Sequence, residues 1–433
     1  MHAVEAQPHL RNFAGHVRNA PLDRAETTSL LALLLADLMQ LRPNGAEVFK
    51  NQIGRILDHR DYCVFATVAL QYCSCIESRT GDRPMEFGMF HQFPALPGRS
   101  EKEAFAEAFE QIDAAERWGL DTMWLAELHF DPQRSVLSAP LSIAAAVGAR
   151  TERIKIGIAV QVLPLCHPLR LAEEAATVDH ISGGRLIFGV GRSGLPRTYE
   201  DYGVSYAESR DRFAEVLDIV ELAWSQPGFS YEGKYYNFKN ISVAPRPLQE
   251  PYPPIRIAAA SPDTYPAVGA RGLPIFINAR YGSFAEFAPE IRAYRQAYAA
   301  AGHKGRGQVY LRVPAYLAET QERARAEPRE SLMHFYREQA QRLRDSLSRA
   351  GTRAIEGRAE RLKRIENLTY EEALTGQVLV GTPDEVTERL RGLQDELGVD
   401  GILAELNCGG LVPHRQVMTA LQLLCQEVMP RFH

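Results

Sequence analysis

Two short segments place side chains able to do chemistry directly after apolar runs. Residues 124–130, WLAELHF, carry Glu127 and His129, a carboxylate and an imidazole two positions apart. An imidazole at the end of a strand can exchange a proton or hydrogen-bond a bound intermediate, and a purely structural histidine is the alternative. Residues 188–192, FGVGR, end in Arg192, whose guanidinium offers a fork of donors that suits a phosphate. A surface ion pair would explain this arginine equally well.

Two further segments favour the phosphate interpretation. Arg210 lies at the start of an expected helix over Ser209–Trp224, and AAASPDT, residues 258–264, follows an expected strand. Ala260, Ser261 and Thr264 stand just before or at the start of the next helix in this segment. A helix start presents free backbone N–H groups and the positive end of the helix dipole, which suit phosphate. Simple helix capping by Ser261 or Thr264 is the alternative.

FGVGRSG, residues 188–194, also contains the G-x-G-x-x-G pattern of dinucleotide-binding folds. In that fold the glycines open a helix, whereas here Pro196 follows and is expected to disfavour helical backbone before it. The acidic residue that should end a second strand is Asp211, which falls inside a helical pattern. The sequence therefore argues against a dinucleotide fold.

The elements that position these residues alternate between strand and helix from Met85 onward. IKIGIAVQVL is apolar nearly throughout, as a strand buried on both faces should be, and LRLAEEAATVDHI then shows helical spacing. Eight such strands predict an α/β fold, a (β/α)8 TIM barrel with insertions, rather than an open sheet. The expected strands are Glu86–Phe90, Thr122–Glu127, Ile154–Leu163, Arg185–Gly191, Ile255–Ala260, Ile275–Asn278, Tyr310–Leu317 and Ile402–Leu406.

Three segments fall outside this alternation. Residues 1–84 predict a mostly helical N-terminal extension of unknown role, before a barrel domain over residues 85–433. Residues 227–254, rich in Tyr, Pro and Gly, form an insertion before the fifth strand. Residues 320–375 are strongly charged with helical character, and an insertion after a late strand lies on a barrel face. This insertion is expected to be either a lid or a solvated helical hairpin.

Composition narrows the class of protein. The chain has 433 residues, 45% hydrophobic and 24% charged, with a net charge of −5, which gives no reason to expect nucleic acid or an anionic membrane as partner. The apolar run at 30–39 is half the length of a membrane span, and no secretory signal is expected. Six scattered cysteines include only one close pair, Cys73 and Cys75, so no metal site is predicted and a reducing cytoplasm fits.

From Met85 to the C-terminus the chain resembles the bacterial luciferase-like flavin monooxygenases. The resemblance implies a (β/α)8 barrel that takes reduced FMN from a separate flavin reductase. It also implies that molecular oxygen is activated as a flavin hydroperoxide, which oxygenates a small-molecule organic substrate, and that the protein is a homodimer. The matching segments are MEFGMF, WGLDTMWLAELHF, VLPLCHPLRLAEEAATVDHISGGRLIFGVGR, ESRDRF, ARGLP and VGTPDEV.

The resemblance also implies roles for individual residues. Ala159 and Val160 match a non-proline cis peptide packed against the isoalloxazine ring, and Gly191 takes the place of a luciferase cysteine near the flavin. Glu127 and His129 lie in the family's catalytic segment. The residues that match the family's phosphate site are Arg192, Arg210, Ala260, Ser261 and Thr264.

The sequence departs from the luciferases at Leu128, which replaces the first of two adjacent histidines and the one tied to catalysis. His129 matches the second. Light emission from a long-chain aldehyde is therefore not expected, and the acid or base role passes to His129 or is lost. Two other functions stay open at this point: hydride transfer with a deazaflavin on the same fold, and a non-catalytic luciferase-like subunit.

Overall fold

The computed structural model describes residues 84–95, 98–279, 282–348 and 355–433. The chain divides into two compact units, residues 1–80 and 81–433, and the description below concerns the second. The predicted helical N-terminal extension and the Cys73–Cys75 pair lie outside the described residues.

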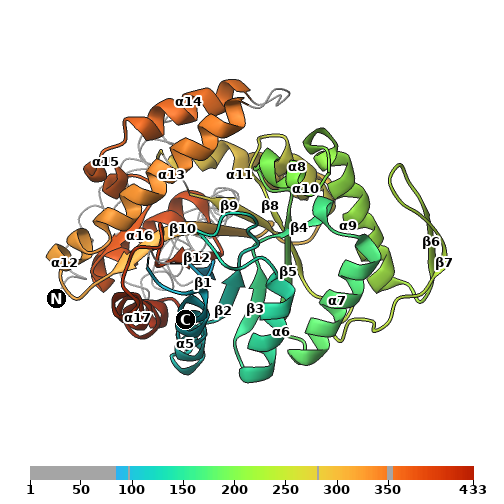
Figure 1. The fold of residues 1–433 in the computed structure, drawn as a ribbon, viewed down its shortest axis with the longest axis horizontal. Coiled ribbons are helices and arrows are strands. Elements are labelled where there is room, and N and C mark those ends of the chain that lie inside the picture. The colour runs from blue at the N-terminus through green and yellow to red at the C-terminus, as the bar shows by residue number, and fades with distance from the viewer. Residues whose placement is uncertain (1–83, 96–97, 280–281, 349–354) are drawn as a thin grey trace, which may run out of the picture. The chain divides into compact units, whose positions relative to one another are not determined.

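Eight parallel strands close into a barrel, as the alternation of apolar runs predicts (Figure 1). The closing strand pairs with its neighbours on both sides, since Gly401 aligns with Tyr310 on one side and with Glu86 on the other. Each strand is buried almost throughout, which explains its continuous apolar sequence. In barrel order the strands are β1 (Glu86–His91), β2 (Thr122–Leu125), β3 (Lys155–Ile158), β5 (Leu186–Gly191), β8 (Ile255–Ala258), β9 (Ile275–Asn278), β10 (Val309–Leu317) and β12 (Gly401–Glu405).

A helix follows each barrel strand, and local sequence determines where several of them begin. Ser100 and Glu103 form a capping box at the start of the first helix, and Thr382 and Glu385 form another at the seventh. Proline occupies an early position in four of them, where its missing N–H is not needed. The helices are α5 (Glu101–Arg117), α6 (Pro140–Arg150), α7 (Pro168–Ile181), α9 (Ser209–Ser225), α10 (Thr264–Arg271), α11 (Ala288–Ala300), α16 (Pro383–Leu397) and α17 (His414–Leu423).

One local expectation is wrong, and one short helix was not expected. The strand predicted over Ile154–Leu163 is interrupted, because the Ala159–Val160 peptide bond is cis, and it resumes as β4 (Gln161–Val162) paired to β5. Leu195, the residue before Pro196, is extended as expected, whereas Pro196 itself opens a short helix that was not predicted, α8 (Pro196–Asp201). Proline is favoured at a first helical position because that N–H has no intrahelical partner. The closed barrel itself rules out the open dinucleotide fold.

The barrel interior contains an aromatic ring and an ion pair that span several strands. The Trp124 ring occupies the space beside Gly157, where a Cβ atom would lie 2.0 Å from the ring carbon Cε3. Arg256 on β8 donates to both carboxylate oxygens of Glu86 on β1, each at 2.9 Å. Its guanidinium lies 3.6 Å from the centroid of the Tyr310 ring. These buried contacts fix the strands that carry the candidate site.

Two insertions interrupt the alternation where the sequence predicts them. The first is an antiparallel hairpin of β6 (Phe229–Glu232) and β7 (Asn237–Ile241), at the far right of Figure 1. The second, called the helical insertion, follows β10, and its two longer helices pack side by side above the strands. It comprises α12 (Gln321–Ala326), α13 (Arg329–Ser348), α14 (Ile355–Glu366) and α15 (Tyr370–Thr375).

The helical insertion has an apolar cluster of its own, separate from the barrel core. Leu332, Phe335 and Tyr336 on α13 pack with Ile365 on α14 and Tyr370 on α15. A short strand, β11 (Leu379–Gly381), follows the insertion and pairs with β10, which joins the insertion back to the barrel. This strand was not predicted. The remaining short turns are η1 (Leu163–Leu165), η2 (Tyr206–Glu208), η3 (Phe284–Phe287), η4 (Leu424–Val428) and η5 (Met429–Arg431).

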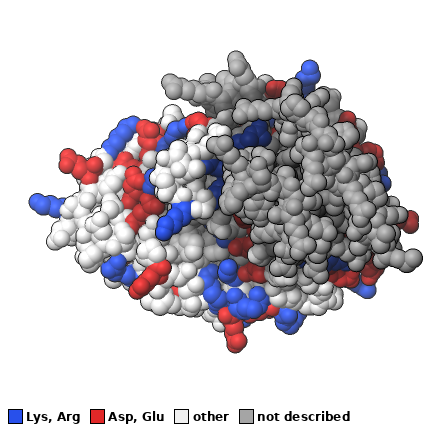
Figure 2. Space-filling view, turned by 180° about the vertical axis from the view of Figure 1, so that it is seen from behind, with Lys and Arg blue, Asp and Glu red and all other residues white. Residues whose placement is uncertain are grey.

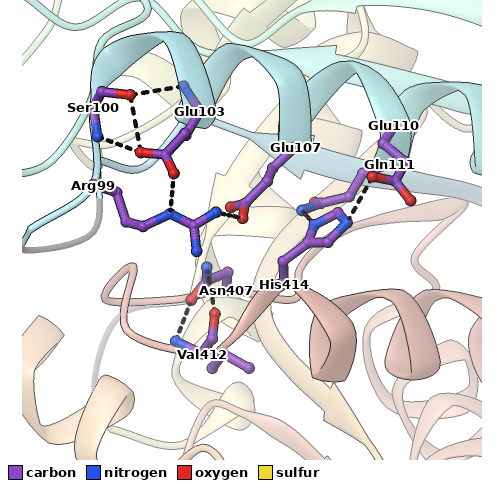
Figure 3. Close-up of polar contacts among 9 residues, drawn as sticks. All are labelled: Arg99, Ser100, Glu103, Glu107, Glu110, Gln111, Asn407, Val412 and His414. Carbon is purple, nitrogen blue, oxygen red and sulfur yellow. Dashed lines mark hydrogen bonds and ion pairs between the residues drawn. The ribbon is translucent and has the colours of Figure 1, made fainter.

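The first and last helices of the barrel are joined by a polar network. Gln111 on α5 lies 3.1 Å from Nδ1 of His414 at the start of α17, whose Nε2 is 3.1 Å from Glu110 (Figure 3). On its other side Gln111 contacts the buried ring of His91 at 3.0 Å. Burial lowers the pKa of His91 from 6.5 to about 4, so the ring is neutral.

The described surface mixes both signs of charge. On the face shown in Figure 2, Lys and Arg side chains are interspersed with Asp and Glu wherever described residues are visible. In the described part of the chain, no helix is long and apolar enough to cross a membrane. Likewise, the described residues contain no group of three or more His, Cys, Asp or Glu that could hold a metal ion.

Candidate active site

Glu127 and His129 follow β2 at the carboxyl end of the barrel and contact each other. His129 Nε2 lies 2.8 Å from Glu127 Oε1, and the two side chains are 10% and 3% exposed. The second carboxylate oxygen, Oε2, accepts hydrogen bonds from the Gln161 side chain at 2.6 Å and from the Val162 backbone N–H at 2.8 Å. The pair is therefore held by β4 as well as by β2.

Tyr202, just after α8, completes this group. Its hydroxyl lies 3.1 Å from His129 Nδ1, and the two rings meet edge to face with centroids 5.1 Å apart. Phe130 packs against Tyr202 at 5.3 Å and adopts a φ of +57°, a left-handed conformation that a bulky residue rarely takes. Backbone in that region clusters at functional sites.

An apolar floor lies beside this group at the barrel mouth. Leu128, Ala159, Val160 and Ala258 are partly buried and pack on the interior cluster that contains Trp124. Gly191, at the end of β5, adjoins the floor, since a Cβ atom there would lie 2.5 Å from Val160 Cγ2. The missing side chain leaves room for the floor in its present position.

Arg192 lies next to Gly191 and is half-buried. Its Nη1 lies 3.3 Å from the hydroxyl of Ser209, the buried first residue of α9. The Tyr199 hydroxyl donates a hydrogen bond to the Arg192 backbone carbonyl, and burial raises the pKa of this tyrosine. The guanidinium thus stands at the N-terminus of α9, where the helix dipole also favours an anion.

The loop after β8 lies against the same helix start. Arg210 forms an ion pair with Asp263, and this pairing, with a hydrogen bond from Ser261, lowers the pKa of Asp263 to about 2. Ser261 and Thr264 share a hydrogen bond of 2.8 Å between their hydroxyls. Ala260 is exposed in the same loop. We call this set the anion patch: Arg192, Ser209, Arg210, Ala260, Ser261 and Thr264.

A cleft of about 200 Å³ opens between α8 and α13 beside His129. Arg342 on α13 spans it, donating to Asp131 at 2.8 Å and to Glu338 on its own helix at 3.3 Å. Most of the lining is polar. The lining residues are His129, Phe130, Asp131, Leu195, Pro196, Arg197, Thr198, Asp201, Glu338, Gln341, Arg342, Asp345 and Ser346.

Sequence patterns anticipate most of this arrangement and miss part of it. The residues proposed from the sequence lie on successive strand ends at one barrel mouth. Gln161, Ser209 and Tyr202 were not singled out. Gln161 has a signal in the sequence, since it is the one polar side chain after Lys155 in the strand pattern IKIGIAVQVL. Tyr202 has none, because only the fold brings it to His129.

Comparison with known proteins identifies related chains. Residues 85–401 match the family profile described as luciferase-like monooxygenase. The oxygenase component of a flavin-dependent trigonelline monooxygenase from Acinetobacter baylyi is 29% identical over 184 residues, 42% of this chain and 51% of that one. An F420-dependent glucose-6-phosphate dehydrogenase from Kineococcus radiotolerans is 34% identical over 165 residues, 36% of this chain and 48% of its own. This chain spans about half the length of the first curated relatives it matches.

A solved structure shares the whole fold. The oxygenating constituent of 3,6-diketocamphane monooxygenase from Pseudomonas putida, in complex with FMN, superposes with a TM-score of 0.68. The match covers 81% of this chain and 99% of that one, at 22% sequence identity. At this sequence identity, the structural similarity shows a common fold and nothing more.

Proposed function

The chain belongs to the luciferase-like monooxygenase family, and on that premise we propose that it is a two-component monooxygenase using reduced FMN and molecular oxygen. Three features meet at one barrel mouth: the anion patch, the apolar floor, and the Glu127–His129 group. Their adjacency carries the proposal, because FMN combines a phosphate with a flat, largely apolar ring system. The known relative that is an oxygenase component supports a separate flavin reductase as partner.

The residues present fit this cofactor. Arg192, Arg210 and Ser209 offer charged and hydroxyl donors at a helix N-terminus, where a phosphate binds well. Ser261 and Thr264 add hydroxyls from the loop after β8. When bound, reduced FMN supplies the electrons that activate oxygen.

The apolar floor has a second role in the proposal. Leu128, Ala159, Val160 and Ala258 would lie under the ring system and exclude water from one of its faces. The absence of a side chain at Gly191 leaves the ring a close approach to the strand end. His129 and Glu127, held by Gln161, would keep a proton available at the edge of this floor.

The organic substrate is proposed to enter through the cleft between α8 and α13. The helical insertion forms one wall of this cleft and would act as its cover, joined to the loop after β2 by the Arg342–Asp131 ion pair. Because the cleft is lined mainly by polar side chains, we expect a substrate with hydrogen-bonding groups. Cys166, Cys408 and Cys425 are free thiols, which fits a reducing cytoplasm. A homodimer stays a prediction.

The relatives also support a second candidate, hydride transfer with the deazaflavin coenzyme F420. The observation in its favour is the 34% identity to an F420-dependent dehydrogenase over 165 residues, 36% of this chain. The anion patch would serve a phosphate of either cofactor. The two functions differ in whether oxygen reacts with the bound cofactor.

An anaerobic titration with reduced FMN, followed by rapid mixing with oxygenated buffer, tests the proposal. We expect tight binding, and oxidation of the bound flavin that is slower than, and spectrally distinct from, oxidation of free reduced FMN. Arg170→Ala is a matched control, since Arg170 is 75% exposed on α7 and pairs with Glu174 away from the site. Weak FMN binding together with tight F420 binding would replace the first candidate by the second.

A further inference from the structure

The geometry around His129 shows which of its ring nitrogens carries the proton. Nε2 faces Glu127 Oε1, a carboxylate oxygen that can only accept when ionised, so Nε2 is the donor. The other oxygen, Oε2, already accepts two N–H donors, from Gln161 and Val162, which hold the carboxyl group in this orientation. A neutral imidazole then has its lone pair on Nδ1.

Tyr202 stands at that lone pair. Its hydroxyl is 3.1 Å from Nδ1 and must be the donor, because Nδ1 of this tautomer can only accept. Burial, followed by the negative charge of Glu127, raises the pKa of Tyr202, so the phenol stays protonated and able to donate. The two hydrogen bonds therefore run in one direction, from the Tyr202 hydroxyl to His129 and from His129 to the Glu127 carboxylate.

This alignment has a consequence for His129. Both of its nitrogens are engaged, Nε2 with Glu127 and Nδ1 with Tyr202, so a ligand cannot reach either one directly. Tyr202 is 46% exposed, against 10% and 3% for the His129 and Glu127 side chains, and it packs on Phe130, which lines the cleft. The phenol is thus the accessible end of the group.

We propose that Glu127, His129 and Tyr202 form a proton relay, and that Tyr202 is the residue that takes a proton from a hydroxyl-bearing substrate in the cleft. The substrate O–H bond breaks and its proton forms a new bond to Tyr202 Oη. The original phenol proton moves to His129 Nδ1, and the Glu127 carboxylate stabilises the resulting imidazolium. No electrons are gained or lost in this step. The substrate class rests on the proposed function, whereas the relay geometry does not.

Several other charged or titratable groups face this relay and contribute to its pH dependence. Cys166 lies on the β4 side, and burial raises its pKa to about 12, so it stays a neutral thiol. The ion pairs of Arg197 with Asp201 and of Arg342 with Asp131 and Glu338 lie around the cleft. The groups to consider are Glu127, Cys166, Tyr199, Asp131, Arg197, Asp201, Glu338, Arg342 and Asp345.

The ¹⁵N chemical shifts of the imidazole nitrogens test the geometry. We expect His129, assigned by the loss of its signals in His129→Gln, to be protonated on Nε2 with a hydrogen-bonded Nδ1. Tyr202→Phe keeps the ring that packs on Phe130 and removes only the hydroxyl, so the Nδ1 shift should move to that of a free acceptor. Tyr298→Phe is the control, since Tyr298, near the C-terminal end of α11, donates to the backbone carbonyl of Lys304 in the loop that follows. A proton on Nδ1 in the wild type, or identical shifts in Tyr202→Phe, overturns the relay.

Titration of 4-nitrophenol, whose absorbance reports its ionisation, tests proton abstraction. With saturating wild-type protein, we expect the ionisation midpoint to fall by about one pH unit, because the relay accepts the proton. Tyr202→Phe should abolish this shift and Tyr298→Phe should retain it. If the wild-type protein leaves the titration curve of 4-nitrophenol unchanged, the proposal that the substrate bears a hydroxyl group is overturned. Neither measurement uses flavin, so a failure of the FMN titration is distinguished from a failure of this proposal.

Discussion

Replacing Arg192 by alanine gives the most direct test of the anion patch. Arg192 is half-buried between Gly191 and the N-terminus of α9, with one hydrogen bond, to the Ser209 hydroxyl. A hydrogen bond to a charged group contributes about 1.5–3 kcal/mol. Loss of the guanidinium should therefore raise the dissociation constant of FMN about 10- to 150-fold, since 1.4 kcal/mol corresponds to about tenfold.

Arg210 should matter less, for a reason visible in the structure. Its side chain is 61% exposed and already paired with Asp263. Interactions of exposed ion pairs contribute about 0.2–1 kcal/mol. Arg210→Ala should accordingly weaken FMN binding by no more than about fivefold.

Riboflavin provides the matched ligand, because it has the same ring system and lacks the phosphate. Anaerobic titrations of each protein with reduced FMN and with reduced riboflavin give the ratio of the two dissociation constants. Arg192→Ala should change this ratio while leaving riboflavin binding as in the wild type. If both flavins weaken equally, Arg192 acts through the structure of the barrel mouth. If neither weakens, the phosphate does not bind at this patch.

Three further results are expected. Asp263→Asn should tighten FMN binding up to about fivefold and leave riboflavin unchanged, because it releases Arg210 from its ion pair; weaker FMN binding would contradict this. Gly191→Ala should lower the free energy of unfolding by about 1–3 kcal/mol and weaken both flavins, since its Cβ would meet Val160 Cγ2 at 2.5 Å. If Gly191→Ala has the melting temperature and flavin affinity of the wild type, the apolar floor shifts to make room for the added Cβ. Burial lowers the pKa of His91 from 6.5 to about 4. The free energy of unfolding is therefore highest above pH 6.5 and falls by about 3 kcal/mol as the pH drops toward 4. Urea unfolding across this range should show a smaller pH-dependent loss in His91→Gln than in the wild type, and equal losses would refute the assignment.

Local sequence was sufficient for the barrel but not for every contact at its mouth. The strands were predictable because runs such as LIFGVG are apolar at every position, a pattern that a strand buried on both faces requires. The interruption at Ala159 and Val160 has no signature in composition, and came only from the family resemblance. At Pro196 two effects of proline act together, since it disfavours helical backbone at Leu195 and favours the first position of the helix that follows.

The site residues divide in the same way. Glu127 and Arg192 were found because each follows a recognisable strand, and a parallel barrel gathers strand ends at one face. Tyr202 lies 73 positions from His129, and nothing in either segment specifies their contact. Distant pairs of this kind depend on the packing of α8, which the three-dimensional structure alone provides.

The separate apolar cluster of the helical insertion has a consequence for how this protein can be altered. Leu332, Phe335 and Tyr336 pack mainly with α14 and α15, and only Cys408 and Val380 join the same cluster from the barrel side. The helical insertion can therefore be replaced as a unit by the corresponding segment of a relative, without changes to the barrel strands. Such a graft must preserve Arg342, which donates to Asp131, and Ser331, whose hydroxyl donates to the Cys408 carbonyl and accepts from the Leu411 N–H. Under the proposed function, such an exchange should change the substrate range and leave the proposed flavin site on the barrel intact.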